Sequence, residues 1–466
     1  MNPIDDGRRG VASRPTSVSN SWPATAPGPT TRRQFLATAT RAVAATSLAA
    51  LDISRFAHAA GSGVIRLGLI GCGWRGTGAT RNALEAGKDI RVVAMADLLE
   101  EKITSCLDQL RKVPAAAQLD VTSGRRFSGF DGFQSLLAAG VDGVMIATPP
   151  GFHPLQFEAA VRAGVHCFLE KPVAVDAPGV RSIRTAAAEA RRKRLSVIVG
   201  FQEHFEKAYE QFMSQIANGA LGKISKLNAI IRMENWPRGI LQRPALDRQL
   251  RRPATEMDYQ IRNWYQFLWL SGDPFVETLV HPIDTCVWAM GGPPQSARGQ
   301  AERREHTGTD FGNISDFLSA HYLYPAGTEI KAEISVLAGN GKAWGSSFEG
   351  EKGIATPPDN IVDRQGQVIW RFSGPKNDPH REEIKQWCDS IRQGKGLNTV
   401  DSAADSTLVA IMGRTAAYTG REVTWTEMLS ANDSFFIHNP KSFQDDPPEL
   451  PDKFGDYLFP PRGRQG

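Results

Sequence analysis

The sequence has few cysteines, no long apolar segment and little excess of charge of either sign. Five cysteines are scattered along it: Cys72, Cys106, Cys167, Cys286 and Cys388. Their odd number and irregular spacing argue against a disulfide framework, and no metal site is predicted. The most apolar stretch near the start ends at Leu51, contains Arg41, and is too short to cross a bilayer. We therefore expect no stable membrane insertion.

The small positive charge of the chain lies entirely in its first 59 residues. These hold seven arginines, three aspartates and no lysine or glutamate, so their net charge is +4. This equals the formal net charge of all 466 residues. The remainder is about neutral and offers no basic surface for nucleic acid. Nucleic-acid binding is therefore excluded as the main function.

The first 59 residues have the features of an export signal. Residues 1–30 are rich in Pro, Ser, Thr and Arg, which is typical of disorder. Residues 31–36, Thr-Arg-Arg-Gln-Phe-Leu, have the form of a twin-arginine signal, and a small-residue cleavage site ends at Ala59. An amphipathic transit helix or a membrane anchor is the alternative. We expect export to the periplasm through the twin-arginine route. This route carries folded proteins, so the protein can acquire its nucleotide before export.

A glycine-rich turn between two apolar runs is the strongest functional signal. The run 64–70 is followed by Gly71, Gly73 and Gly76, then by a helical pattern and a second run that ends at Asp97. In a dinucleotide site the first glycine allows the turn, the second lets the backbone approach the pyrophosphate, and the third lets helix and strand pack. An acid about 20 residues further on binds the ribose hydroxyls. The pattern predicts a nicotinamide-nucleotide domain.

Helical and strand patterns alternate from residue 81 to 200, which is typical of a doubly wound parallel sheet. Three polar segments follow predicted strands, at 148–153, 170–172 and 201–204. Since loops at the carboxyl ends of parallel strands form the ligand crevice, we expect these segments to meet there.

These motifs resemble the glucose–fructose oxidoreductase / inositol dehydrogenase / MocA (Gfo/Idh/MocA) family. The resemblance rests on the glycine turn, on Thr-Pro-Pro-x-x-His at 148–153 and above all on Glu-Lys-Pro at 170–172, and it covers about residues 63–430. It looks closest to an exported bacterial branch, through residues 259–265, 269–272 and 411–414. It implies a Rossmann domain followed by an α+β domain with an open, largely antiparallel sheet. It also implies NAD or NADP, sugar-like or cyclitol substrates, and a homodimer or tetramer formed through that sheet.

Four regions are predicted: a leader (1–59), a Rossmann domain (60–200), an α+β substrate and oligomerisation domain (201–430) and an irregular C-terminal arm (431–466). Alternating patterns predict strands at 224–233, 296–302, 314–323, 329–337 and 345–349, and a helix over 403–418 that ends at Gly420. The predicted nucleotide site comprises Gly71, Gly73, Trp74, Arg75, Gly76, Asp97, Thr148, Pro149, His153, Glu170, Lys171 and Gln202. Asp97, which no basic residue follows directly, favours NAD over NADP. His153 and Gln202 can equally cap loops.

Lys171 and His281 are the predicted catalytic residues. Lys171 lies at a strand end, where it can hold a substrate hydroxyl beside the nicotinamide. The family typically has Asp, three residues, then His; here Glu277 and His281 match that spacing, with Glu in place of Asp. At helical spacing the two would share a face, with the carboxylate orienting the imidazole, although Pro282 favours a kink. A surface Glu–His pair with a structural histidine is the alternative.

A polar and aromatic cluster is the predicted substrate site. It consists of Tyr259, Arg262, Asn263 and Trp264, with Asp284 added from the segment around His281. Aromatic rings beside hydrogen-bonding groups suit a sugar, but aromatics at this density are as often core residues. His380 precedes a predicted helix over 382–391 and is expected to cap it.

We expect an exported NAD(P)-dependent oxidoreductase with a tightly held nucleotide, acting on a secondary hydroxyl of a sugar, glycoside or cyclitol. The alternative is glycoside cleavage by oxidation and elimination, as in some relatives, which needs an additional base such as Tyr259 or His204. A non-catalytic sensor or binding protein is a third hypothesis.

Overall fold

The computed structural model describes residues 63–234, 239–436 and 439–459. The predicted leader, its twin-arginine motif and the cleavage site near Ala59 lie outside these residues. No helix among the described residues is long and apolar enough to cross a membrane.

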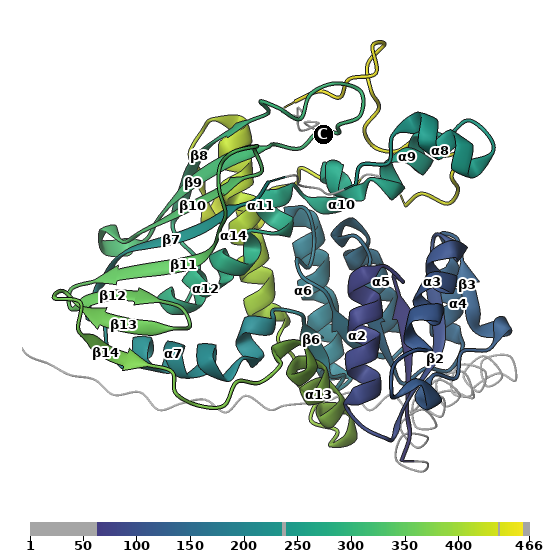
Figure 1. Cartoon of the computed structure of the whole chain (residues 1–466), viewed down its shortest axis with the longest axis horizontal. Coiled ribbons are helices and arrows are strands. Elements are labelled where there is room, and N and C mark those ends of the chain that lie inside the picture. The colour runs from purple at the N-terminus through teal and green to yellow at the C-terminus, as the bar shows by residue number, and fades with distance from the viewer. Residues whose placement is uncertain (1–62, 235–238, 437–438, 460–466) are drawn as a thin grey trace, which may run out of the picture. The chain divides into compact units, whose positions relative to one another are not determined.

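The first sheet of the described chain is parallel throughout, with strand order β3-β2-β1-β4-β5-β6. Its strands are β1 (Ile65–Ile70), β2 (Ile90–Asp97), β3 (Arg126–Ser128), β4 (Gly143–Ile146), β5 (His166–Leu169) and β6 (Val197–Val199). The helices between them are α2 (Trp74–Glu85), α3 (Glu100–Leu110), α4 (Gly132–Ala138), α5 (His153–Arg162) and α6 (Ala177–Arg192). Continuous burial of β4, β5 and β6 explains their unbroken apolar sequences. This doubly wound arrangement is the predicted one (Figure 1).

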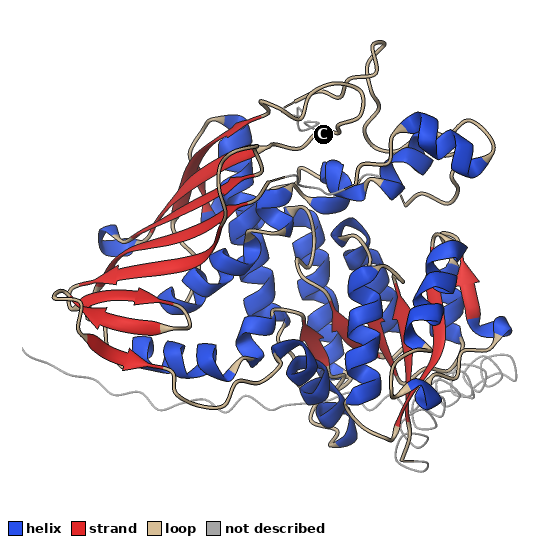
Figure 2. Ribbon diagram, viewed as in Figure 1, coloured by secondary structure: helices blue, strands red, loops and turns tan. Residues whose placement is uncertain are grey.

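The second sheet has the order β14-β13-β12-β11-β7-β10-β9-β8-β15, with a single parallel pair, β7 and β10, among its described neighbours. Its strands are β7 (Ile224–Arg232), β8 (Ser296–Glu302), β9 (Phe317–Leu323), β10 (Glu329–Ser335), β11 (Ala343–Gly350), β12 (Gly353–Thr356), β13 (Asn360–Asp363), β14 (Val368–Arg371) and β15 (Val423–Thr424). The family's open, largely antiparallel sheet is therefore present (Figure 2). The strands β12 to β14 were not predicted.

The remaining described helices follow the strands of the first sheet along the chain. They are α7 (Lys207–Ala217), α8 (Arg243–Leu250), α9 (Glu256–Arg262), α10 (Leu268–Ser271), α11 (Pro274–Glu277), α12 (Val280–Met290), α13 (Pro379–Arg392), α14 (Val400–Thr419) and α15 (Trp425–Ser430). Helix α14 is buried on nearly all sides because it packs on β8 and β9 and also on α6. It ends at Gly420, whose φ of 66° is left-handed, as the sequence predicts.

Helix α13 returns to the first sheet, so the predicted boundary at residue 200 does not separate the two cores. The Trp387 indole donates to the Ser196 carbonyl at 3.1 Å, and Asn398 forms a bridge with Val197 at the end of the sheet. This helix starts earlier than expected, and its cap is Asp378, which accepts from the Arg381 amide. His380 lies inside the first turn and does not cap the helix.

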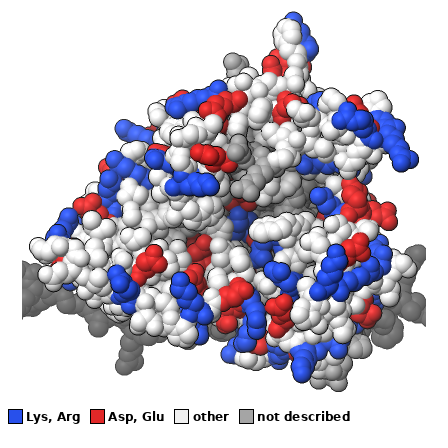
Figure 3. Space-filling model, viewed as in Figure 1, with Lys and Arg blue, Asp and Glu red and all other residues white. Residues whose placement is uncertain are grey.

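The C-terminal arm contains no helix or strand in its described residues, 431–436 and 439–459. It lies against both halves of the chain: Phe443 packs edge-on against Phe130, and Gln260 donates to the Glu449 carbonyl at 2.7 Å. On the face shown in Figure 3, basic and acidic side chains alternate without a large patch of one sign.

Candidate functional site

The three glycines of the turn have three different steric surroundings. Gly71 has a φ of +93°, and a Cβ there would lie 2.6 Å from the Ala147 carbonyl carbon. A Cβ on Gly76 would lie 1.9 Å from the carbonyl oxygen of Gly71, so only glycine lets α2 approach the strand this closely. A Cβ on Gly73 would meet nothing within 4 Å. Gly73 thus borders open space at the N-terminus of α2, where a pyrophosphate fits.

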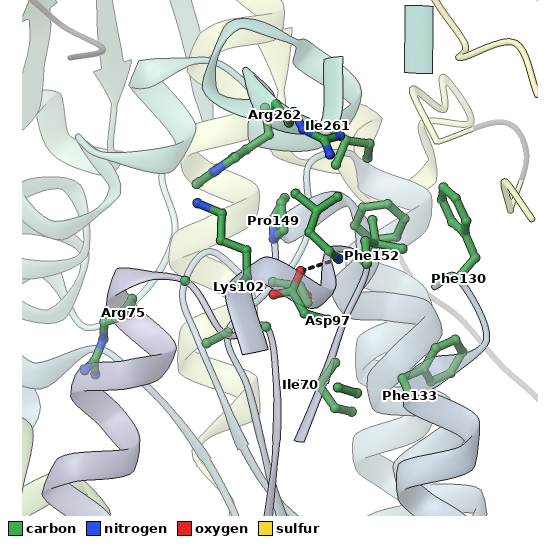
Figure 4. A pocket seen from close by; sticks show the side chains of 18 of the residues that line it. Ile70, Arg75, Asp97, Lys102, Phe130, Phe133, Pro149, Phe152, Ile261 and Arg262 are labelled. Atoms are coloured by element: carbon green, nitrogen blue, oxygen red, sulfur yellow. Dashed lines mark hydrogen bonds between the residues drawn. The ribbon is translucent and has the colours of Figure 1, made fainter. Parts of the chain in front are cut away.

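Asp97 ends β2 and is held at the edge of this space. Its Oδ2 accepts from the Cys72 amide at 2.7 Å and its Oδ1 from the Leu99 amide at 2.9 Å. Burial raises the pKa of Asp97 above its ordinary value, although these two amides act in the opposite direction. Lys102, from α3, and Arg262, from α9, extend into the space near Asp97 (Figure 4).

A cavity of about 650 Å³ continues from the glycine turn toward the second half of the chain. This size is within the range of small-molecule and cofactor sites. Predicted residues that line it are Gly71, Gly73, Trp74, Arg75, Asp97, Thr148, Pro149, Arg262 and Trp264. Tyr265 and Asn439 line it as well, so the α9 region and the arm form part of its wall.

Arg75 joins the glycine turn to the Glu-Lys-Pro segment. Its Nε lies 2.6 Å from Glu170 Oε1, and its Nη2 lies 2.7 Å from Glu383 Oε1 on α13. Burial disfavours the charged guanidinium, but the two carboxylates outweigh it and raise the pKa of Arg75. Glu170 therefore holds Arg75 and does not line the cavity, which corrects its predicted contact with the nucleotide. Glu383 was missed because it lies 308 residues after Arg75, with no local motif.

Lys171 is paired with Glu277. Its Nζ donates to the Glu277 carbonyl at 2.6 Å and to Oε1 of the same residue at 3.0 Å. Oε2 of Glu277 accepts from the Thr278 hydroxyl at 2.6 Å. Burial alone raises the pKa of Glu277, but the Lys171 charge and this hydroxyl outweigh it and keep the pKa below its ordinary value.

The predicted pairing of Glu277 with His281 is wrong. Helix α11 ends at Glu277 and α12 begins at Val280, so the two residues are not on one continuous helix. Pro282 lies in the first turn of α12, where proline is tolerated, and the chain breaks before it instead of kinking at it.

His281 is paired with Glu203, which the sequence analysis missed. The imidazole Nδ1 lies 3.1 Å from Glu203 Oε2, and Oε1 of Glu203 accepts from Gln202 Nε2 at 2.9 Å. Burial by itself raises the pKa of Glu203, but the charge and hydrogen bond of His281 outweigh it and lower the pKa. The Phe201 ring packs edge-on against the imidazole at 5.9 Å. Gln202 therefore supports Glu203 and does not line the cavity, which corrects its predicted role.

A second histidine–carboxylate pair lies beside the first. His204 Nε2 is 2.7 Å from Asp284 Oδ2, while Asp284 Oδ1 accepts from the Ser406 hydroxyl at 2.7 Å. The His204 ring stacks on Trp288 at 4.1 Å. Burial lowers the pKa of His204, but the Asp284 charge outweighs it and raises the pKa overall. Asp284 is buried with partners on both oxygens, so it holds His204 and is not the substrate ligand we predicted.

His153 is a structural residue. Its ring is fully buried between two carbonyl oxygens, that of Pro172 at 2.9 Å from Nδ1 and that of Thr148 at 2.8 Å from Nε2. Burial lowers the pKa of His153 to about 4, so the ring is neutral and one nitrogen donates. His153 ties two strand-end loops together, which is the loop-capping alternative and not the predicted cofactor contact.

The predicted substrate cluster around residue 260 is mostly core. Tyr259 is fully buried, its hydroxyl donates to the Asp310 carbonyl at 2.9 Å, and Arg243 lies over its ring. Asn263 exchanges hydrogen bonds with the Leu241 backbone. Arg262 and Trp264 do face a cavity, but it is the one beside Asp97. Lys171 and His281 are not among the residues that line this cavity.

Comparisons with known proteins identify both halves of the chain. Residues 65–201 match a family model described as an oxidoreductase family with an NAD-binding Rossmann fold, and residues 209–356 match the GFO/IDH/MocA C-terminal domain. An inositol 2-dehydrogenase 2 of Saccharopolyspora erythraea is 27% identical over 341 residues, which are 71% of this chain and 86% of that protein.

Two solved structures share the fold. The scyllo-inositol dehydrogenase of Lactobacillus casei, with bound cofactor NAD(H) and scyllo-inositol, matches with a TM-score of 0.54 and 17% identity, over 78% of this chain and 99% of that one. The aldose-aldose oxidoreductase of Caulobacter crescentus, complexed with glycerol, matches with a TM-score of 0.56 and 16% identity, over 78% and 99%.

Proposed function

Because the chain belongs to the Gfo/Idh/MocA family of NAD-binding oxidoreductases, we propose that it oxidises a secondary hydroxyl of a sugar, glycoside or cyclitol, or reduces the corresponding ketone. One observation carries the proposal. Lys171 and His281 each have a carboxylate partner of their own, and Lys171 and Glu203, the partner of His281, follow the strands β5 and β6 of the nucleotide-binding sheet. The names of the inositol dehydrogenases among the relatives support a polyhydroxylated ring as substrate.

The residues at the glycine turn fit a dinucleotide. The open space at Gly73 and the N-terminus of α2 would accommodate the pyrophosphate. The Asp97 carboxylate would accept hydrogen bonds from the ribose hydroxyls. When bound, NAD supplies the acceptor for the hydride. Because Asp97 would repel a ribose phosphate, we infer that NAD is preferred, while Lys102 and Arg262 leave NADP as the alternative.

Lys171 and His281 divide the handling of the proton. An ammonium group has three donors, and Glu277 accepts from the Lys171 ammonium at two atoms, which leaves a donor for the substrate oxygen. Nδ1 of His281 is hydrogen-bonded to Glu203, and no described residue forms a hydrogen bond with its Nε2. Nε2 is therefore the acceptor for the hydroxyl proton, and the Glu203 carboxylate stabilises the resulting imidazolium.

Export, a tightly held nucleotide and self-assembly complete the proposal. The twin-arginine motif at 31–36 supports delivery of the folded protein to the periplasm, with cleavage near Ala59. Asn439 lines the cavity and Phe443 packs on Phe130 of its wall, which supports slow release of the nucleotide. The open sheet supports a homodimer or tetramer.

The experiment is to purify the exported protein, extract its nucleotide, and test reduction of retained NAD with sugars, glycosides and cyclitols at 340 nm. We expect bound nucleotide and turnover with at least one ring polyol, and loss of turnover in His281→Ala with the nucleotide retained. A nucleotide-free protein that gains no thermal stability from NAD or NADP would refute the proposal.

Glycoside cleavage by oxidation and elimination is a second candidate, favoured by the His204–Asp284 pair. Cleavage needs a base beside the carbon next to the oxidised one, and the His204 side chain is 26% exposed beside the His281 pair. The other predicted base, Tyr259, is buried in the core. Release of nitrophenol from nitrophenyl glycosides without net NADH would identify cleavage, and loss of that release in His204→Ala would assign the base.

A further inference from the structure

Trp344 is an exposed indole next to the catalytic histidine. It lies on β11, and its ring centroid is 6.5 Å from that of His281, with 42° between the ring planes. The imidazole thus has two aromatic neighbours, Phe201 and Trp344.

The register of the sheet shows that Trp344 is on the core-facing side of β11. It pairs with Ile231, as Ser346 pairs with Ala229 and Phe348 with Leu227, and these five neighbours are buried. Because side chains alternate along a strand, Trp344 shares their face, yet it is 59% exposed. The core ends at this point, and the first turn of α12 brings His281 beside the uncovered indole.

An exposed tryptophan in a core-facing row is unusual because burying its ring is favourable. Indole faces bind flat surfaces of C–H groups, and the axial C–H bonds of a six-membered polyol ring form such a surface. A six-membered ring resting on Trp344 would lie beside the His281 imidazole, whose centroid is 6.5 Å from that of the indole.

We propose that Trp344 is the platform on which a six-membered carbohydrate or cyclitol ring stacks for oxidation at His281. This inference rests on the function proposed above and defines its substrate class as pyranosides or cyclitols with one apolar face, in preference to open-chain polyols. Trp344 thereby determines substrate specificity.

The experiment uses the full chain loaded with NAD, with methyl β-D-glucopyranoside and myo-inositol as ring probes and the open-chain glucitol as a comparison. Wild type, Trp344→Ala, Trp344→Phe and the control Phe454→Ala are compared by saturation-transfer NMR and by NADH formation. Phe454 is a matched control because it is an aromatic residue of the arm that is 72% exposed. Melting temperature and retained nucleotide verify that each variant is folded.

We expect saturation of the ring C–H protons in wild type and its loss in Trp344→Ala. KM should rise roughly tenfold or more with kcat changed less than about threefold, as loss of one aromatic contact predicts. Trp344→Phe should restore most of the binding, and Phe454→Ala should behave as wild type.

Two results separate this inference from the proposed function. Ring binding that depends on Trp344, without NADH formation from any probe, would refute the oxidoreductase proposal and keep the platform. Turnover with an unchanged KM in Trp344→Ala would refute the platform and keep the enzyme. A change of oligomeric state in Trp344→Ala without a change in ring binding would show that a second copy of the chain covers the indole, and would also overturn the inference.

Discussion

Replacing Glu203 with glutamine tests the assignment of His281 most directly. The substitution keeps the shape of the side chain and removes the charge that faces Nδ1 at 3.1 Å. Since His281 and Glu203 lower the free energy of each other's charged form, the same contact that lowers the pKa of Glu203 favours the imidazolium. Glu203→Gln therefore disfavours proton uptake at His281.

The size of the effect follows from the type of hydrogen bond. A bond to a charged group contributes about 1.5–3 kcal/mol and a neutral bond about 0.5–1.5 kcal/mol, so the loss is roughly 1–1.5 kcal/mol. A difference of about 1.36 kcal/mol corresponds to a factor of ten in rate. The plateau rate should fall roughly tenfold, because the imidazolium formed during turnover is less stable.

The assay is the pH profile of NADH formation with retained or added NAD, measured on wild type, Glu203→Gln and the control Glu158→Gln. Glu158 is on α5 and its side chain is 51% exposed. A plateau rate that Glu203→Gln leaves at the wild-type value would refute the role of Glu203. A loss of rate of equal size in Glu158→Gln would show that the effect is not local.

Three further predictions concern the nucleotide site and the fold. Gly73→Val should abolish nucleotide retention with little loss of folding, since the new side chain enters the open space proposed for the pyrophosphate. Gly76→Ala should instead lower the melting temperature, because its Cβ would lie 1.9 Å from the Gly71 carbonyl oxygen. Equal melting temperatures of the two variants would contradict this. Phe443→Ala should speed NAD release several-fold in a dilution assay, because it removes the ring that packs on Phe130, and an unchanged release rate would exclude the arm from nucleotide retention. Burial lowers the pKa of His166 from 6.5 to about 4, so its contribution to stability is present above pH 6.5 and is lost as the pH falls toward 4. Between pH 7 and 4.5, the free energy of unfolding measured in urea should fall by roughly 2–3 kcal/mol less in His166→Gln than in wild type. An equal fall in both proteins would contradict the neutral buried ring.

The residues that the sequence predicted well are those whose role is fixed by the local backbone. Gly71, Gly73 and Gly76 differ in what a Cβ would meet, and each surrounding agrees with the role given by its position in the motif. Asp97 ends a buried strand, so its place at the cavity follows from the end of that strand. Parallel strands bring such ends together without any long-range information.

The partners of the charged residues could not be predicted because they come from distant segments. Glu383 reaches Arg75 from α13, and Glu203 reaches His281 from 78 residues earlier in the chain. The polar side chains around Tyr259 were misplaced for the converse reason. Their composition suits both a sugar site and a core with hydrogen-bonded aromatics, and only the burial of Tyr259 distinguishes the two.

Glu277 illustrates how a correct motif can carry an incorrect contact. The spacing to His281 suggested one helix face, but that inference requires an unbroken helix, and the chain leaves helical hydrogen bonding between α11 and α12. With the helix broken, the Glu277 carboxylate is directed to Lys171, and the imidazole takes its carboxylate from Glu203 at the end of β6. Lys171 and His281 thus each have a carboxylate partner of their own. A change at Glu277 is then expected to act first through Lys171 and the grip on the substrate oxygen, whereas a change at Glu203 acts through proton uptake.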